Sequence, residues 1–274
     1  MVAGLDVVTN SDEMLRADCA PRNAPDGILT VADWVQAGRY ALGLDPLTLV
    51  PPPLVSQQKV TFHGSPAPTR TVELATVSAQ RGQTVSVPVL LISSTNENAV
   101  GLTVTYNSSQ LKYLSTALGS ALSSGRLNIN TNPAAGKVGL ALALSPGASL
   151  AAGTNQIAVL QFQTATNAVG NLPLILDSSV VQLQVADKTA VALTANYVNG
   201  AVSLPPAPTV QTLKVGNNLT LAWPISAGSY VVQSANSPTG PWSNAPQNIN
   251  TNGINANVTV QATNQQQFYR LLGQ

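Results

Sequence analysis

Residues 84–92 read TVSVPVLLI and residues 137–144 read KVGLALAL. Both runs are rich in β-branched and aliphatic residues and are bordered by Gly, Asn, Ser or Pro, which is typical of β-strands. Further runs of this kind lie between residues 72 and 185: VELATV, GLTVTY, LKYL, LNIN, IAVLQF, LPLIL and VVQLQV. Strands at this spacing, without helical periods between them, predict an antiparallel sandwich or barrel.

Pro-containing stretches border this β region on both sides, with PPP at residues 51–53, GSPAP at 64–68 and LPPAP at 204–208. Such sequences favour extended connections over packed structure. After the last stretch, LTLAW, SYVVQS, NVTVQA and FYRLL repeat the strand pattern. We therefore expect a mainly β chain, divided into a helical module (1–46), a linker (47–70), a β-sandwich (71–204), a short linker (205–208) and a small β domain (209–274).

The composition excludes several classes of function. Charged residues make up 8% of the chain and the formal net charge is +1. Without a Lys/Arg cluster, nothing would neutralise a row of phosphates or an anionic lipid surface. No apolar stretch is long enough to span a membrane, and the first ten residues lack the pattern of a signal peptide, so an export signal would lie upstream. A net charge near zero favours association between copies.

Catalytic groups are scarce. After residue 46 the chain has four carboxylates, Glu73, Glu97, Asp177 and Asp187, too few and too dispersed for a carboxylate pair. His63 is the single histidine and lies beside Gly64 in the expected linker, and Cys19 has no histidine near it in sequence. We therefore expect no enzymatic activity.

The segment DGILTVADW at residues 26–34 has the shape of the second half of an EF-hand-type calcium loop. Asp26 and Gly27 make the turn, the backbone carbonyl of Ile28 follows, and the carboxylate of Asp33 begins the helix. Asp18 could supply the leading carboxylate, although the stretch between Asp18 and Asp26 is longer than the regular spacing. The alternative is an ordinary turn and a helix that packs without metal.

Residues 18–45, DCAPRNAPDGILTVADWVQAGRYALGLD, resemble one dockerin repeat, and AGLD at residues 3–6 echoes its end. The resemblance implies Ca²⁺ as a cofactor, with Asp18, Asp26 and Asp33 as side-chain ligands. It also implies a helix over residues 31–42 that begins at a cap near Thr30 and ends at Leu42-Gly43. The face of this helix would bind a protein partner through Val31, Trp34, Val35 and Arg39.

Residues 72–204 resemble a cohesin, a jelly-roll sandwich, through the order of VELATVSAQRGQTVSVPVLL, GLTVTYNSSQLKYLSTALG, KVGLALALSPGASLAAGTNQIAVLQFQT and YVNGAVSL. Asn107 stands where many cohesins have Asp. Residues 209–274 resemble small fibronectin type III-like domains of exported bacterial proteins. Their aromatic residues Trp223, Tyr230, Trp242 and Tyr269 could form a sugar-binding platform, although aromatic residues in so small a domain are more often core.

A plug-like and a socket-like module in one chain suggest an extracellular or cell-surface protein whose copies associate head to tail into a filament or scaffold. Exchange of β-strands between copies would serve the same end. Two alternatives stay open. The chain could be a fragment of a scaffold that anchors other cohesin- or dockerin-bearing proteins. It could also be a carbohydrate-binding accessory protein, for which exposed, coplanar Trp223 and Trp242 would be required.

Overall fold

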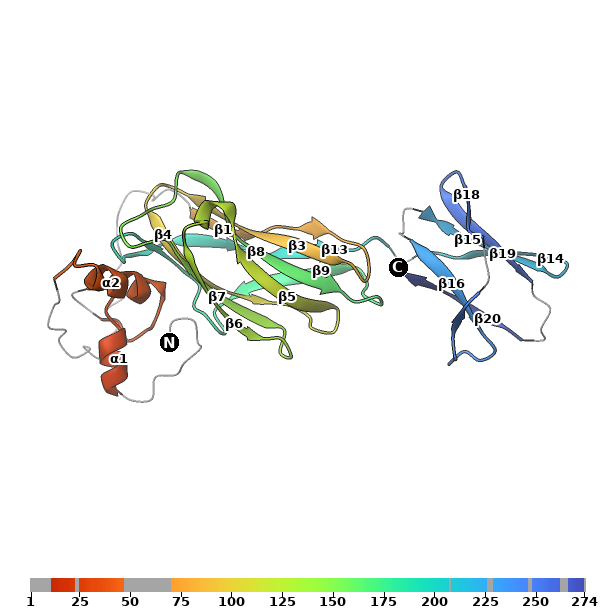
Figure 1. Cartoon of the computed structure of the whole chain (residues 1–274), viewed down its shortest axis with the longest axis horizontal. Helices are drawn as coiled ribbons and strands as arrows, with labels where there is room; N and C mark the ends of the chain where they lie inside the picture. The colour runs from red at the N-terminus through yellow and green to blue at the C-terminus, as the bar shows by residue number, and fades with distance from the viewer. Residues whose placement is uncertain are drawn as a thin grey trace.

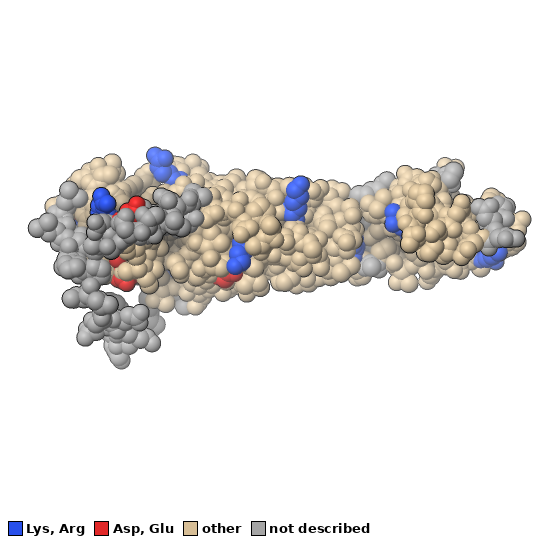
Figure 2. Space-filling model, turned by 90° about the horizontal axis from the view of Figure 1, so that it is seen from below, with Lys and Arg blue, Asp and Glu red and all other residues tan. Residues whose placement is uncertain are grey.

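The computed structural model describes residues 11–22, 25–46, 70–206, 208–225, 229–245, 248–261 and 266–273. His63 and all of the expected linker before Arg70 lie outside this part of the chain. Two helices occupy one end of the molecule, a large β-sandwich the centre and a smaller β domain the other end (Figure 1). On the face of the described residues that Figure 2 shows, charged side chains are few and lie apart from one another along the tan surface of the two β domains.

The sandwich has two sheets. The first has the strand order β12-β1-β3-β8-β5. The second runs β11-β10-β4-β9-β13-β2, with β7 paired to β4 and β6 to β7. The elements are β1 (Arg70–Leu74), β2 (Val77–Ser78), β3 (Thr84–Ser93), β4 (Glu97–Thr105), β5 (Leu111–Leu118), the 3₁₀ helix η1 (Ser120–Leu122), β6 (Arg126–Asn132), β7 (Lys137–Ala143), β8 (Gly153–Thr164), β9 (Asn171–Asp177), β10 (Gln184–Asp187), β11 (Ala192–Leu193), β12 (Ala195–Val198) and β13 (Gly200–Ser203).

The core lies between the two sheets because alternate side chains of each strand point inward. On β3 the inward side chains include Val87, Val89 and Leu91, all fully buried. Phe162 of β8 lies deep in this core, with the ring of Tyr106 at 5.0 Å between centroids in an edge-to-face arrangement. An edge-to-face pair of aromatic rings stabilises the folded state beyond what burial of the apolar area of the rings contributes.

A buried ion pair anchors β1 to the turn before β4. The guanidinium of Arg70 contacts the carboxylate of Glu97, and its Nη2 donates to Asn96 Oδ1 at 2.8 Å. Glu97 also accepts from the backbone N–H groups of Ser94, Thr95 and Asn96. Burial by itself raises the pKa of Glu97, but these hydrogen bonds and Arg70 leave that pKa below its ordinary value.

The helical module contains α1 (Ser11–Ala17) and α2 (Val31–Ala41). The small β domain has a four-stranded sheet, β14-β15-β19-β18, and a three-stranded sheet, β17-β16-β20. Its core includes Trp223, Val232 and Val258. Its strands are β14 (Gln211–Val215), β15 (Asn218–Pro224), β16 (Tyr230–Ala235), β17 (Ser243–Asn244), β18 (Asn250–Asn252), β19 (Asn255–Gln261) and β20 (Phe268–Gly273).

Candidate functional site

Helix α2 is defined at both ends by its local sequence. Thr30 is the N-cap, and its side chain accepts from Ala32 N while the Asp33 carboxylate accepts from Thr30 N, which makes a capping box. Gly43 ends the helix in the left-handed conformation, with φ of 67°. The predicted start and end of this helix are therefore confirmed.

The outer surface of the sandwich carries a patch of small residues on β4, β7 and β10. Across β4 and β7, Ala99 lies opposite Ala143 and Gly101 opposite Ala141, and Ala186 of β10 lies opposite Ala99 on the other side of β4. We call these five residues the alanine-glycine face. Because their side chains are short, another element can approach the sheet backbone closely.

Helix α2 packs on the alanine-glycine face. Val31, Ala32 and Val35 are buried in a cluster with the alanines of this face. Glycine is required at position 101, because a Cβ there would lie 2.6 Å from the Gln182 carbonyl oxygen and 3.1 Å from Cγ1 of Val31. The helix and the sheet are thus closely packed, because apolar side chains of the helix fill the space that the small residues of the sheet leave.

Hydrogen bonds hold both ends of α2 against the sandwich. Ala32 N at the start of α2 donates to Oε1 of Gln184 on β10 at 3.1 Å. Near the end of α2, Arg39 Nη1 donates to the carbonyl of Lys188 at 2.8 Å, and Arg39 Nε pairs with Asp45 at 2.7 Å. Hydrogen bonds from Arg39 and Gln36 lower the pKa of Asp45 to about 2.

The sequence of the sandwich can be assigned to a family. Residues 70–204 match the sequence model of the cohesin domain. The central sandwich is a cohesin domain. Cohesins are non-catalytic protein-binding modules, and the match confirms the expected jelly-roll fold.

Solved cohesin structures are similar to the chain at low identity. The sixth cohesin of scaffoldin B from Acetivibrio cellulolyticus, solved with a dockerin, is 25% identical, covers 50% of this chain and 99% of its own, and gives a TM-score of 0.44. A Clostridium acetobutylicum cohesin is 23% identical over 49% of this chain and 90% of its own, with a TM-score of 0.42. A non-cellulosomal cohesin from Archaeoglobus fulgidus is 15% identical, covers 50% of this chain and 91% of its own, and gives a TM-score of 0.43. Comparison with curated proteins gives no match.

The side chains predicted to bind a partner lie against the chain's own cohesin domain. Val31 and Val35 are buried there, and Arg39 reaches Lys188. Trp34 is half-buried and lines a groove of about 410 Å³ between α2 and the segment that follows β7, which includes Pro146. In this structure the predicted partner surface is thus already occupied by an intramolecular contact.

The predicted calcium ligands do not fit a metal site in this arrangement. Both oxygens of Asp33 accept hydrogen bonds, and Asp18 Oδ2 accepts from Gly27 N at 2.6 Å. Asp26 Oδ1 accepts from Ile28 N, and both of these residues are exposed. Within the described ranges no group of three or more His, Cys, Asp or Glu side chains is placed to hold a metal ion.

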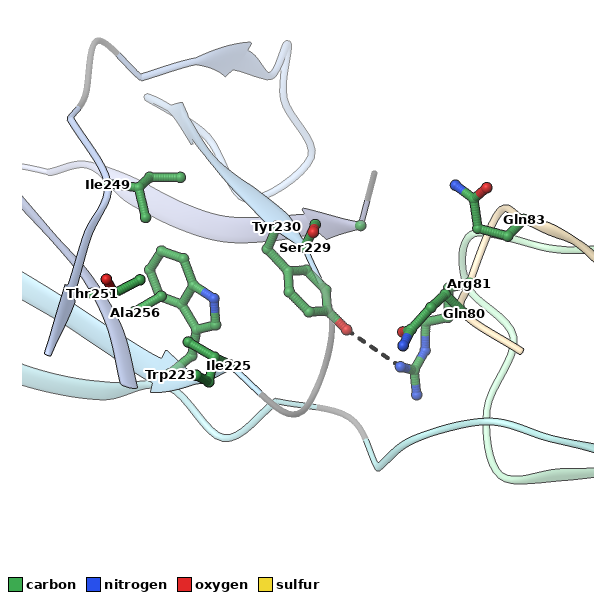
Figure 3. Close-up of a pocket in the computed structure, with 11 residues that line it drawn as sticks. Gln80, Arg81, Gln83, Trp223, Ile225, Ser229, Tyr230, Ile249, Thr251 and Ala256 are labelled. Carbon is green, nitrogen blue, oxygen red and sulfur yellow. Dashed lines mark hydrogen bonds between the residues drawn. The ribbon is translucent and has the colours of Figure 1, made fainter. Parts of the chain in front are cut away.

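A second pocket, of about 540 Å³, lies between the cohesin domain and the small β domain (Figure 3). The buried Arg81 of the cohesin domain donates to the carbonyls of Ala168 and Pro205 and, at 3.3 Å, to the hydroxyl of Tyr230 (Figure 3). These bonds connect the two domains through one guanidinium. The described residues that line the pocket include no His, Cys, Asp or Glu side chain.

The aromatic residues of the small β domain do not form an exposed platform. Trp223 is 2% exposed and belongs to the core. The guanidinium of Arg270 lies over the ring of Trp242, 4.4 Å from its centroid. The pair of exposed, coplanar indoles that carbohydrate stacking requires is absent at these two positions.

Sequence reasoning identified the helix face but missed the surface on which it packs. The signal was present in KVGLALAL, where Gly139, Ala141 and Ala143 alternate with Val138, Leu140 and Leu142. In the structure the larger residues enter the sandwich core and the smaller ones face outward. A strand with large residues on one side and small ones on the other indicates a second element on its outer face.

Among the helices of the described part, none is both long and apolar enough to cross a membrane.

Proposed function

We propose that this chain is a non-catalytic, extracellular or cell-surface assembly protein whose cohesin domain binds helical modules of protein partners. The observation that carries the proposal is the packing of α2 on the alanine-glycine face. A surface of small residues that accepts one amphipathic helix through Val31 and Val35 offers the helix-in-groove mode of recognition.

We further propose that the partner is another copy of the chain. The surface and the helix that fits it are present in equal numbers in every copy, so the same contact can form within a chain or between chains. Between chains it is heterologous, and it extends into an open filament if the rotation between copies does not close. The net charge of +1 gives little repulsion between copies. The dockerin-like character of residues 18–45 supports the same pairing.

The test is the molar mass of the full chain by light scattering over a range of concentrations, with negative-stain microscopy. Wild-type chain should form dimers and longer assemblies as concentration rises. Val35→Asp should abolish association, because it places a charge in the buried contact. Ala37→Asp is the matched control, since Ala37 lies on the exposed side of the same helix. A wild-type chain that stays monomeric throughout contradicts self-association.

Mixing two variants tests the direction of the contact. Val35→Asp damages the helix and leaves the face intact, whereas Ala141→Trp fills the face and leaves the helix intact. Each variant alone should be monomeric. Their mixture should yield a one-to-one complex and nothing longer, because only one helix and one face remain functional. A mixture without a complex would count against head-to-tail pairing.

A further inference from the structure

The buried carboxylate of Asp33 lies at the centre of the loop that resembles a calcium loop. Asp33 is 2% exposed. Its Oδ1 accepts from Cys19 N and Ala20 N, both at 2.8 Å, and its Oδ2 accepts from Thr30 N at 2.8 Å and Thr30 Oγ1 at 3.2 Å. A carboxylate offers about four lone-pair positions. These four donors therefore occupy Asp33 completely and leave no position for a metal.

The other carboxylates also hold backbone groups. Asp18 Oδ2 accepts from Gly27 N at 2.6 Å, which joins the two arms of the loop, and Asp26 Oδ1 accepts from Ile28 N at 2.9 Å within its own turn. Among the described loop residues, Asp18 Oδ1 is the one buried carboxylate oxygen without a hydrogen-bond partner. Calcium needs roughly six to eight oxygen ligands, and a single unpartnered buried carboxylate oxygen supplies a small part of that set.

We propose that Asp33 replaces the cation: the loop from Asp18 to Asp33 is closed by a carboxylate clasp on backbone N–H groups and folds without calcium. The cation of a calcium loop draws carboxylates and carbonyls inward, whereas here one carboxylate draws N–H groups from both arms of the loop inward. Thr30 N belongs to the start of α2, and Cys19 N and Ala20 N to the opposite arm. The clasp thus fixes α2 in the position in which Val31 and Val35 reach the cohesin domain.

This inference goes beyond the proposed function, because a chain with a calcium-independent module can associate or remain monomeric. The test uses the full wild-type chain, stripped with a chelator and then titrated with calcium chloride. Hydrogen exchange of the segment 18–34 and calorimetric binding are measured in both conditions. Exchange should be equally slow with and without calcium, and no saturable binding heat should appear. Calcium that binds in one-to-one ratio and slows exchange of this segment would overturn the proposal.

Two variants separate the clasp from a metal site. Asp33→Asn replaces one accepting oxygen by an NH₂ group that opposes its N–H neighbours, so exchange of the segment 18–34 should accelerate in both media. Asp26→Asn, at the exposed turn, is the matched control and should leave exchange close to wild type. Equal protection in Asp33→Asn and wild type would overturn the proposal. If Asp33→Asn does not fold, the wild-type calcium titration still decides.

Discussion

Ala99 on β4 lies directly opposite Ala143 on β7, and both side chains pack in the cluster that buries Val31 and Val35 of α2. The sheet and the helix approach each other closely here because the side chains of the sheet at the contact are alanines. The fit between them depends on residue size at a few positions, which makes it sensitive to single substitutions.

Ala99→Leu should lift α2 from the sheet. Overpacking of a close contact costs about 1 to 3 kcal/mol, and the helix, which lies on the outside of the sheet, can move away more readily than the strand. Amide exchange in residues 31–41 should accelerate while the cohesin strands stay protected. Ala117→Leu is the matched control, because Ala117 lies on an exposed position of β5. Unchanged protection of α2 in Ala99→Leu would contradict a close fit.

Local sequence patterns determine the helix and its ends, and the order of strand runs indicates the fold of the sandwich. The helix at 31–41, its Thr30 cap and its Gly43 end follow from short-range chemistry and were predictable. The jelly-roll was predictable from strand runs and from the order of motifs. Long-range contacts were not: nothing near Gln184 in sequence indicates that its side chain meets Ala32 N, 152 residues away.

For the loop at residues 18–33, prediction from the sequence was limited in a different way. The spacing of Asp18, Asp26 and Asp33 indicates oxygen ligands, but a carboxylate can accept hydrogen bonds from N–H groups as well as bind a cation. Only the fold shows that Asp33 points at the N–H groups of Cys19 and Ala20. Residue type and spacing therefore predict where carboxylates gather, and the backbone determines which partner they take.

Glu97→Ala should strongly destabilise the cohesin domain. Removing one member of a buried ion pair leaves the other uncompensated, at a cost of about 3 to 5 kcal/mol. Here it also removes the acceptor of the Ser94, Thr95 and Asn96 N–H groups. Denaturant unfolding of the full chain measures the loss. Glu73→Ala, at a half-buried position of β1, should cost much less; equal losses would contradict the role of the ion pair.

Protonation of Asp45 should loosen the end of α2 in acid. Its pKa is about 2 in the folded chain against an ordinary 3.8, so its contribution is fully present above 3.8 and is lost as pH falls through about 2. Hydrogen exchange in residues 36–46, corrected for intrinsic rates, should rise across that window. Asp45→Asn should exchange faster near neutral pH and lack this step. A step that persists in Asp45→Asn would assign it to another carboxylate.

Cys19 should be unreactive while the helical module is folded. Its side chain is 7% exposed, its thiol donates to the Asp33 carbonyl at 3.3 Å, and burial raises its pKa to about 12. The thiolate, which is the nucleophile, is therefore scarce at neutral pH. Iodoacetamide should label the native chain slowly and the denatured chain rapidly. Asp33→Asn should label faster than Asp26→Asn, and rapid labelling of native wild type would contradict the packing described.

Strand β4 is buried on both of its faces over almost its whole length, by the sandwich core on one side and by α2 and the segment around Val181 on the other. A chain that began at residue 70 would keep every strand of the cohesin domain but would expose an apolar strip along β4 and β7. Exposed strips of this kind promote aggregation. In the described part of the helical module, α2 therefore covers an apolar strip that the cohesin domain alone would expose.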